Sequence, residues 1–310
     1  MLKPYSYAVL LIIMFALINS SHSKATQSLI WLTDDKKDLV DLKSSDNISI
    51  GTDTTKLVLS ALTDYDINIQ LVQLPRAKML MKSMDNLCMS NRVKTKQRLK
   101  DNIFSLPVNV FPSLRLYYLA DNENIFTDNS LKALLNEQGE LKSLAHIFNH
   151  YPNAILATTK GRSFGEVLDK QIQQVPSDNI LQRAGDGRYQ AMMHMLFKGR
   201  VDFIIDFPVE IKRELDAYGK PISLASLPMA DTPDYVVGHI ACSKSDLGEK
   251  VVQQVNSRLL ALYQQAEFFY AHSRYLAEAD LANFAQYYMD VFQSPIPNGV
   301  SEAVLAISNE

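Results

Sequence analysis

The stretch that decides the fold is Lys94-Thr95-Lys96-Gln97-Arg98, which is followed after five residues by Phe104-Ser105-Leu106-Pro107. This pattern is typical of a polar loop with a fixed cation, followed by a short apolar run along which the chain passes from one domain to another. A counterpart lies about a hundred residues later, where the apolar stretch 201–205 ends in Asp206 beside Phe207-Pro208. A cation in one half and an anion in the other suit a polar or zwitterionic ligand held between two lobes.

The first twenty-five residues have the pattern of an export signal. Lys3 supplies a charged start, residues 8–18 form an unbroken apolar run, and Ser21-His22-Ser23 and Ser23-Lys24-Ala25 both offer a small-x-small cleavage site. The apolar run is shorter than the roughly 20 residues that span a bilayer, although an uncleaved membrane anchor is a second interpretation. We expect residues 1–25 to be a cleaved signal peptide and the mature protein to be periplasmic.

Charge and composition limit the partners. The chain has a formal net charge of −3, and removal of Lys3 and Lys24 with the signal makes it about −5 by count. A protein that neutralises phosphates needs a basic face, so nucleic acid is not an expected partner. The six histidines are scattered without the spacing of a zinc site, and we expect no metal or other cofactor. The length suits one large or two medium domains, and we expect a monomer.

Cys88 and Cys242 are the only cysteines of the chain. In an exported protein an even pair indicates a possible disulfide. Two buried thiols are the alternative, and composition alone does not decide between them.

The hydrophobic pattern predicts two sets of alternating strands and helices. The first set has strands at 29–33, 67–72 and 87–89, helices at 52–62 and 76–84, and a further short extended segment at 48–51. The second set has strands at 113–119, 154–157, 201–205 and 222–227, and helices at 163–174 and 189–198. A return strand at 236–241 leads into a long amphipathic helix from 247 to about 265, and 294–310 is expected to be a loosely packed tail. Such alternation implies parallel sheets with helices on their faces.

These motifs resemble those of periplasmic solute-binding proteins of the amino-acid-binding type, the bacterial extracellular solute-binding family 3. The resemblance covers nearly the whole mature chain in order, and it is closest in pattern to a branch known only as transporter substrate-binding-like. Thr95-x-x-Arg98 before Phe104-Ser105-x-Pro107 is similar to the family's loop-to-hinge signature. Gly199-Arg200-x-Asp202 with Asp206 is similar to its second-lobe strand. His239-Ile240-Ala241-Cys242-Ser243-Lys244 is similar to its return crossover, which usually ends in Pro-Lys.

The resemblance implies an α/β fold of the type II periplasmic binding protein class, with two hinge crossovers and a central cleft. Residues 26–108 and 241–293 would form lobe 1, and residues 112–236 would form lobe 2. Such lobes close on a ligand like a hinged clamp. Cys88 would end the third strand of lobe 1, and Cys242 would lie where the chain re-enters that lobe. We therefore predict that the two are neighbours joined by a disulfide.

Arg98 would hold a ligand carboxylate, because the planar guanidinium makes two parallel charge-assisted bonds. A solvated loop charge is the alternative. Thr95 is a second candidate from the same motif. The family usually has another small hydroxyl residue five positions before the arginine, and Val93 stands there, which puts a plain α-amino acid ligand in doubt. Asp206 would pair with a ligand ammonium, or else would cap the helix that Pro208 begins.

Ser163 lies in Lys160-Gly161-Arg162-Ser163-Phe164-Gly165, where backbone N–H groups at a helix start can receive an anion. Ordinary helix capping is the alternative. The stretch also fits Gly-x-Ser-x-Gly, but the length and strand order after Gly165 do not fit an α/β-hydrolase. Trp31, Asp34 and Tyr117 are candidate cleft residues from position only, since an aromatic at a strand end more often fills a core.

We therefore expect a periplasmic binding protein for a small polar, carboxylated or amino-acid-like solute, which it delivers to an ABC transporter permease or a sensor in the inner membrane. One alternative is a clamp-fold enzyme, a dehydratase or lyase acting on a small carboxylated molecule. That enzyme would need a general acid or base in the cleft, and no second candidate accompanies Asp206. We thus expect no catalytic residues. The other alternative is a non-transport accessory protein of a membrane sensor.

Overall fold

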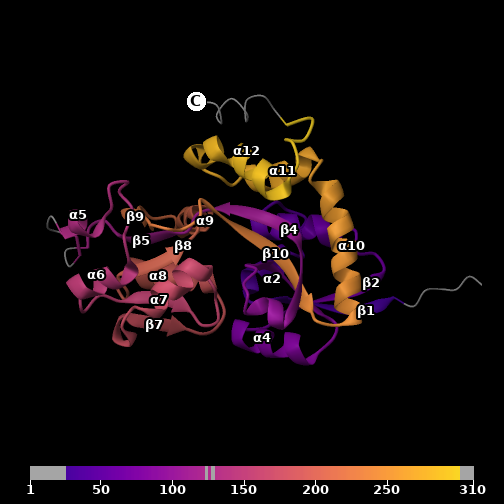
Figure 1. Ribbon diagram of the computed structural model, residues 1–310, viewed down its shortest axis with the longest axis horizontal. Coiled ribbons are helices and arrows are strands. Elements are labelled where there is room, and N and C mark those ends of the chain that lie inside the picture. Colours follow the sequence, from indigo (N-terminus) through magenta and orange to yellow (C-terminus); the bar gives the residue numbers. More distant parts are fainter. Residues whose placement is uncertain (1–25, 123–124, 127–129, 301–310) are drawn as a thin grey trace, which may run out of the picture.

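The computed structural model describes residues 26–122, 125–126 and 130–300, so the expected export signal lies outside the described residues. The chain forms two α/β lobes, each built on a five-stranded sheet (Figure 1). The strand order is β2-β1-β3-β10-β4 in the first sheet and β7-β6-β8-β5-β9 in the second. Within the described ranges, no helix is long and apolar enough to cross a membrane.

Lobe 1 contains the first sheet and the helices around it. Its strands are β1 (Gln27–Thr33), β2 (Tyr65–Leu71), β3 (Leu87–Arg92), β4 (Asn102–Pro112) and β10 (Tyr235–Ser243). Its helices are α2 (Lys36–Asp41), α3 (Ile50–Leu59), α4 (Leu74–Ser83), α10 (Asp246–Leu262), α11 (Ala266–Ser273) and α12 (Glu278–Phe292), with a 3-10 turn at Arg98–Lys100. As the alternating pattern predicts, β1 is parallel to β2 and β3, whereas β10 is antiparallel to both of its neighbours.

Lobe 2 contains the second sheet. Its strands are β5 (Arg115–Leu119), β6 (Leu156–Thr159), β7 (Ile180–Arg183), β8 (Phe203–Asp206) and β9 (Leu224–Pro228). Its helices are α5 (Ser130–Leu134), α6 (Leu144–His150), α7 (Glu166–Gln173), α8 (Arg188–Phe197) and α9 (Pro208–Tyr218), with a 3-10 turn at Ser177–Asn179. The strands β6, β7 and β8 are parallel, and β5 is antiparallel to β8 and β9.

Two long strands, β4 and β10, form the hinge between the lobes. They pair antiparallel from Tyr235 opposite Pro112 to Ser243 opposite Asn102, and both extend from lobe 1 toward lobe 2 (Figure 1). Gly238 allows the two strands to approach closely, because a Cβ there would lie 1.9 Å from the amide oxygen of the buried Asn109. These strands are the two crossovers that the sequence predicted.

Helix starts account for two differences from the sequence-based prediction. The expected extended segment at 48–51 is instead the start of α3, because the Ser49 hydroxyl accepts the N–H of Thr52 at 3.2 Å and caps the helix. Helix α2 was not predicted. Its cap is Asp35, whose carboxylate accepts the N–H of Lys37 at 2.9 Å. In both places a side chain two or three residues away accepts one of the free N–H groups of the first turn.

The C-terminal helices α11 and α12 lie over the end of lobe 1 near the hinge (Figure 1). They enclose an aromatic cluster with α10, whose buried members are Tyr263, Phe268, Phe269, Phe284, Tyr288 and Phe292. The start of the segment that we expected to be a loose tail packs on this cluster. Ser294 is buried, and its hydroxyl donates to the carbonyl of Tyr263 at 3.2 Å. Residues 301–310 of that segment lie outside the described residues.

Cys88 and Cys242 are joined by a disulfide, as predicted. They stand directly opposite each other on β3 and β10, with a Cα–Cα distance of 4.0 Å. The bond therefore ties one hinge strand to the centre of the lobe 1 sheet.

Candidate ligand-binding site

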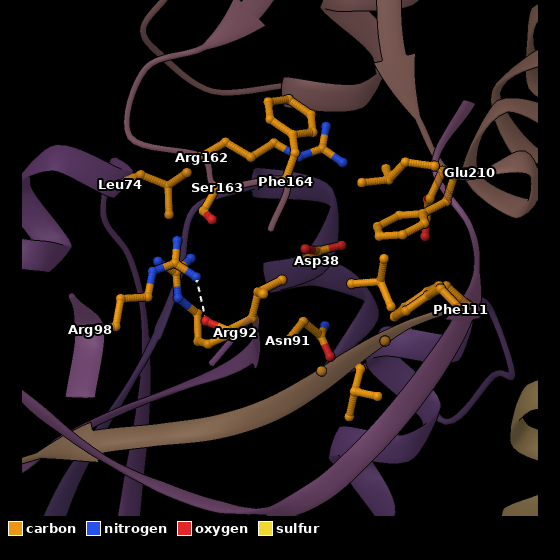
Figure 2. A pocket seen from close by; sticks show the side chains of 18 residues that line it. Asp38, Leu74, Asn91, Arg92, Arg98, Phe111, Arg162, Ser163, Phe164 and Glu210 are labelled. Carbon is orange, nitrogen blue, oxygen red and sulfur yellow. Dashed lines mark hydrogen bonds between the residues drawn. The ribbon is translucent and has the colours of Figure 1, made fainter. Parts of the chain in front are cut away.

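A cavity lies between the two lobes and has about 750 Å³ of space, part of it open to solvent. Lobe 1 and the β4 end of the hinge supply Asp38, Ser49, Gly51, Leu74, Asn91, Arg92, Val93, Arg98 and Phe111. The rest of the wall consists of Leu114, Arg162, Ser163, Phe164, Phe207, Glu210 and the β10 segment 236–238. Figure 2 shows these side chains converging from both lobes on one space.

The lobes touch each other beside this cavity. The backbone N–H of Lys36 donates to the Asp186 carboxylate at 2.6 Å. The ammonium of Lys37 lies 3.3 Å from the Glu214 carboxylate on α9. These contacts join the start of α2 to lobe 2. The two lobes are therefore in contact beside the cavity in this structure.

Arg98 reaches the cavity from the 3-10 turn that follows the polar loop. Its backbone N–H donates to the Thr95 hydroxyl at 3.3 Å, and its Nη1 donates to the carbonyl of Val93 at 2.8 Å (Figure 2). Burial lowers the pKa of the Arg98 guanidinium, while Asp169 and Asp34 raise it. Guanidinium nonetheless keeps its proton in proteins. No carboxylate within the described ranges forms a salt bridge with Arg98, so its charge faces the cavity without an opposite charge in contact.

Asp206 ends β8, and both of its carboxylate oxygens have partners inside lobe 2. Arg162 holds the carboxylate with two bonds, from Nη2 to Oδ1 at 2.7 Å and from Nη1 to Oδ2 at 2.9 Å. Oδ1 also accepts the N–H of Phe207 at 2.9 Å. Asp206 is only 4% exposed and is not among the residues that line the cavity. Arg162 thus occupies the place in which we expected a ligand ammonium.

The start of α7 likewise has an internal partner. The Asp169 carboxylate accepts the N–H of Phe164 at 2.7 Å and the Ser163 hydroxyl at 2.5 Å. The anion that this helix start receives is therefore a side chain of the same helix. Ser163 still lines the cavity, but its hydroxyl proton is directed to Asp169.

The other predicted residues lie at or beyond the edge of the cavity. Trp31 is fully buried in lobe 1, with its indole N–H donating to Ser90 at 2.9 Å. Together with Asp34 it lines a smaller neighbouring cavity with about 390 Å³ of space, part of it open to solvent. Thr95 lines an adjacent groove. Tyr117 is buried in the core of lobe 2, and burial raises the pKa of its hydroxyl.

Sequence reasoning missed most of the cavity wall. Arg162 was inside the glycine-rich stretch but was not singled out, and Phe207 directly follows Asp206. Phe207 stacks on Phe111 of β4 with ring centroids 4.7 Å apart. The carbon at the centre of the Arg162 guanidinium lies 4.6 Å from the centroid of the Phe164 ring. A paired guanidinium beside two aromatic rings depends on contacts between distant segments, which no local pattern reveals.

In the described part of the chain, no group of three or more His, Cys, Asp or Glu side chains is placed so that it could hold a metal ion. The charged groups of the cavity instead form ion pairs or face its interior. The arrangement is suited to recognising a charged group by hydrogen bonds.

Comparisons with known proteins identify the fold. No protein-family model matches the chain, and no curated protein matches it. Solved structures do match. EhuB in complex with hydroxyectoine has a TM-score of 0.59 at 15% identity, over 84% of this chain and 93% of that one. The substrate-binding protein of an amino acid ABC transporter has a TM-score of 0.57 at 14% identity, over 80% and 99%.

A third structure comes from work on glutathione import via GshT and the cystine ABC importer TcyBC of Streptococcus mutans. Its TM-score is 0.55 at 13% identity, over 88% of this chain and 98% of that one. At such identities the likeness concerns the fold, and it extends over nearly the full length of each matched chain. This chain therefore has the two-lobed α/β fold of periplasmic solute-binding proteins.

Proposed function

We propose that the protein is an exported binding protein that closes its two lobes around a small polar solute carrying a carboxylate. The observation that carries this proposal is the Arg98 guanidinium, which lines the cavity and donates to a backbone carbonyl but forms no salt bridge with a described residue. A ligand carboxylate would complete its charge-assisted hydrogen bonds. Thr95 would contribute by fixing the turn on which Arg98 stands.

The fold supports delivery of the solute to an inner-membrane ABC transporter or sensor. One matching structure is described as the substrate-binding protein of an amino acid ABC transporter, and another holds hydroxyectoine. Those descriptions belong to the matched proteins. For this chain they favour a periplasmic carrier of a small molecule, which we propose acts as a monomer.

Closure would follow from contacts to both lobes. A ligand that reaches Arg98 on one side and the Arg162 region on the other gains the full set of contacts only when the lobes approach, so it stabilises the closed arrangement by its differential affinity. The contact between Lys36 and Asp186 would form and break with this movement.

An enzyme on the same fold is the second candidate, and one observation disfavours it. A dehydratase or lyase needs a positioned acid or base in the cleft. Asp206, the predicted candidate, has each of its oxygens bonded to Arg162 and is buried behind the wall. A sensor accessory protein would use the same cavity, and only the identity of the membrane partner separates it from a transport protein.

A ligand screen followed by scattering tests the proposal. The chain without residues 1–25 would be screened by thermal shift against amino acids, polyamines and organic acids. We expect at least one carboxylate-bearing solute to raise the melting temperature and to reduce the radius of gyration in small-angle X-ray scattering. If saturating ligand left the radius of gyration unchanged, or if Arg98→Ala kept the full thermal shift, the clamp proposal would be wrong.

A further inference from the structure

We infer that Asn91 binds the solute with its side-chain amide, which donates a hydrogen bond to an acceptor oxygen of that solute. Asn109 of the hinge strand β4 is the positioning residue that holds the amide in this orientation. This inference rests on the function proposed above and adds a second polar group to the site besides Arg98. It follows from the direction of the hydrogen bonds that connect α3, β4 and β3.

The side chain of Asn91 lies in the wall of the cavity, near the end of β3. It is exposed to that space, and its Oδ1 accepts a hydrogen bond from Nδ2 of Asn109. Its own Nδ2 donates to no residue within the described ranges. Figure 2 shows the oxygen of this amide turned toward the hinge strands and the nitrogen turned away from them. The Asn91 amino group is therefore available to a solute.

The hydroxyl of Thr54 determines which way both amides point. This hydroxyl, on α3, donates its one proton to the carbonyl of Ile50 at 2.7 Å. Its oxygen can then only accept, and Nδ2 of Asn109 lies 3.5 Å from it. The same nitrogen donates to Asn91. The opposite orientation would bring the oxygen of Asn109 against the oxygen of Thr54, with no proton between them. Asn91 must therefore turn its oxygen to Asn109 and its amino group to the cavity.

Backbone conformation and packing do not account for these two amides. Asn91 has a positive φ of 57°, but glycine adopts such a φ more readily. Gly51 leaves room for the Asn91 amide, because a Cβ there would overlap its Nδ2. Oδ1 of Asn109 is buried without a partner in the described part of the chain, and such an acceptor costs stability. An apolar side chain would avoid that cost, so the pair of amides indicates a role in binding.

Asn91 and Arg98 together define what lobe 1 offers to a solute. Both side chains line the cavity, and both donate hydrogen bonds. A solute with a carboxylate for Arg98 and a further oxygen for Asn91 is held by lobe 1 through two polar groups. The Asp38 carboxylate stands in the same wall, so the solute can carry an ammonium group as well. The ligand class is thus a carboxylate that has an additional carbonyl, hydroxyl or carboxylate oxygen.

Probes that differ by one acceptor oxygen test the role of Asn91. Calorimetry on the chain without residues 1–25 would compare hexanoate with 4-oxohexanoate and 5-oxohexanoate, and L-methionine with L-methionine sulfoxide. The added oxygen accepts hydrogen bonds and cannot donate them. The two sets cover solutes without and with an α-ammonium group. We expect the oxygen-bearing probe to bind about fivefold more tightly in at least one pair, the factor that a hydrogen bond of about 1 kcal/mol produces.

Variants of Asn91 test the cause of this preference. Asn91→Gly removes the amide and tolerates the positive φ, so the ratio of affinities within the pair should fall to about one. Asn91→Asp keeps the shape of the side chain but presents an acceptor in place of the donor, so it should reverse the preference. Asn153→Gly, at an exposed position of lobe 2 outside the cavity, should leave the ratio unchanged.

Spectroscopy tests the positioning role of Asn109 without any solute. In isotope-labelled protein, the Nδ2 protons of Asn91 are identified by their loss in Asn91→Gly, and they should show NOE contacts with the Hα protons of Gly51. Asn109→Leu removes the donor that holds the amide. It should weaken these contacts and lower the preference for the oxygen-bearing probe, although no side chain of the cavity wall changes. Thr54→Val should act in the same direction, and it serves if Asn109→Leu does not fold.

The outcomes separate this inference from the function on which it rests. NOE contacts of the Asn91 amide protons with Asn109 in place of Gly51 would show the opposite orientation and overturn the inference. A failure of every oxygen-bearing probe to bind more tightly than its partner, or a preference that survived in Asn91→Gly, would do the same. In each of these cases, loss of carboxylate binding in Arg98→Ala would still support the proposed function. If no carboxylate bound and Arg98→Ala changed nothing, both would be wrong.

Discussion

Arg162 and Asp206 form a bidentate ion pair inside lobe 2, at nitrogen–oxygen distances of 2.7 and 2.9 Å. The side chains are 11% and 6% exposed, respectively, so solvent screens the two charges only weakly. The pair joins the loop after β6 to the end of β8, two neighbouring strands of one sheet. It is therefore part of the architecture of lobe 2 as well as part of the cavity wall.

Asp206→Asn should destabilise the protein by about 3–5 kcal/mol, because removing one partner leaves the other charge buried without compensation. Urea unfolding followed by circular dichroism would measure the change. Asp216→Asn is the matched control, since Asp216 pairs with Lys212 at the surface with side chains 66% and 58% exposed. An exposed pair of this kind contributes about 0–1 kcal/mol.

The double variant Arg162→Met with Asp206→Leu should cost less than the sum of the single changes, because it removes both charges together. A double-mutant cycle built from the four proteins yields the coupling energy. A coupling near zero would contradict the view that the two side chains depend on each other.

Arg98→Ala should weaken binding of a carboxylate ligand by about 1.5–3 kcal/mol, the usual contribution of a hydrogen bond to a charged group. Isothermal titration calorimetry with the ligand found by screening would measure it. Stability should change little, since the side chain donates only to the carbonyl of Val93. Arg76→Ala, at an exposed position of α4, is the control. An unchanged dissociation constant would show that Arg98 is a solvated loop charge.

His272 should make the protein less stable in mild acid. It is a residue of α11 that is fully buried against α12, and burial lowers its pKa to about 4 from the ordinary 6.5. The folded state therefore holds the neutral imidazole, and the unfolded state binds a proton first. The stability due to this group is fully present above pH 6.5 and is lost as the pH falls through about 4, by about 3 kcal/mol in all.

His272→Asn isolates this effect, because its amide can replace the Nδ1–H that donates to the carbonyl of Phe268 at 2.8 Å without titrating. Unfolding free energies measured between pH 4 and pH 7.5 should depend less on pH in the variant, although carboxylates elsewhere contribute to both proteins. Equal pH dependence in the two proteins would exclude His272 as a source.

Replacing Cys88 and Cys242 together by Ser should cost about 2–5 kcal/mol of stability, because the bond closes a loop with a sequence separation of 154 residues. Thermal unfolding with and without a reductant gives the same comparison in the unmodified protein. The reductant should lower the melting temperature of the protein that has both cysteines and leave that of the double variant unaltered.

The fold could be predicted from the sequence because its signals are local or ordered along the chain. Strand β1 and helix α10 follow from runs of apolar residues at the right period. The disulfide followed once Cys88 and Cys242 had been assigned to neighbouring strands. Helix α2 was missed because its six residues are too few for a periodic pattern to appear, and helices α11 and α12 were not predicted either.

The site could be predicted only in part. Arg98 follows from its place before the hinge, and it lines the cavity. The role expected of Asp206 depended on whether another side chain would reach it first, and Arg162 lies 44 residues away in sequence. The anion expected at the start of α7 likewise depended on whether a side chain would reach that place first, and the Asp169 carboxylate accepts hydrogen bonds there from Ser163 and Phe164. Partners of this kind are set by tertiary packing, and a single sequence carries no sign of them.

The Cys88–Cys242 disulfide also closes a covalent ring in the chain. Together with the backbone from 88 to 242 it makes a closed ring that contains the whole of lobe 2 and both hinge strands up to Cys242. A protease that cut one loop of lobe 2 would open this ring without releasing a fragment, because both ends would remain tied at the centre of the lobe 1 sheet. Only a second cut, or reduction of the bond, would divide the molecule.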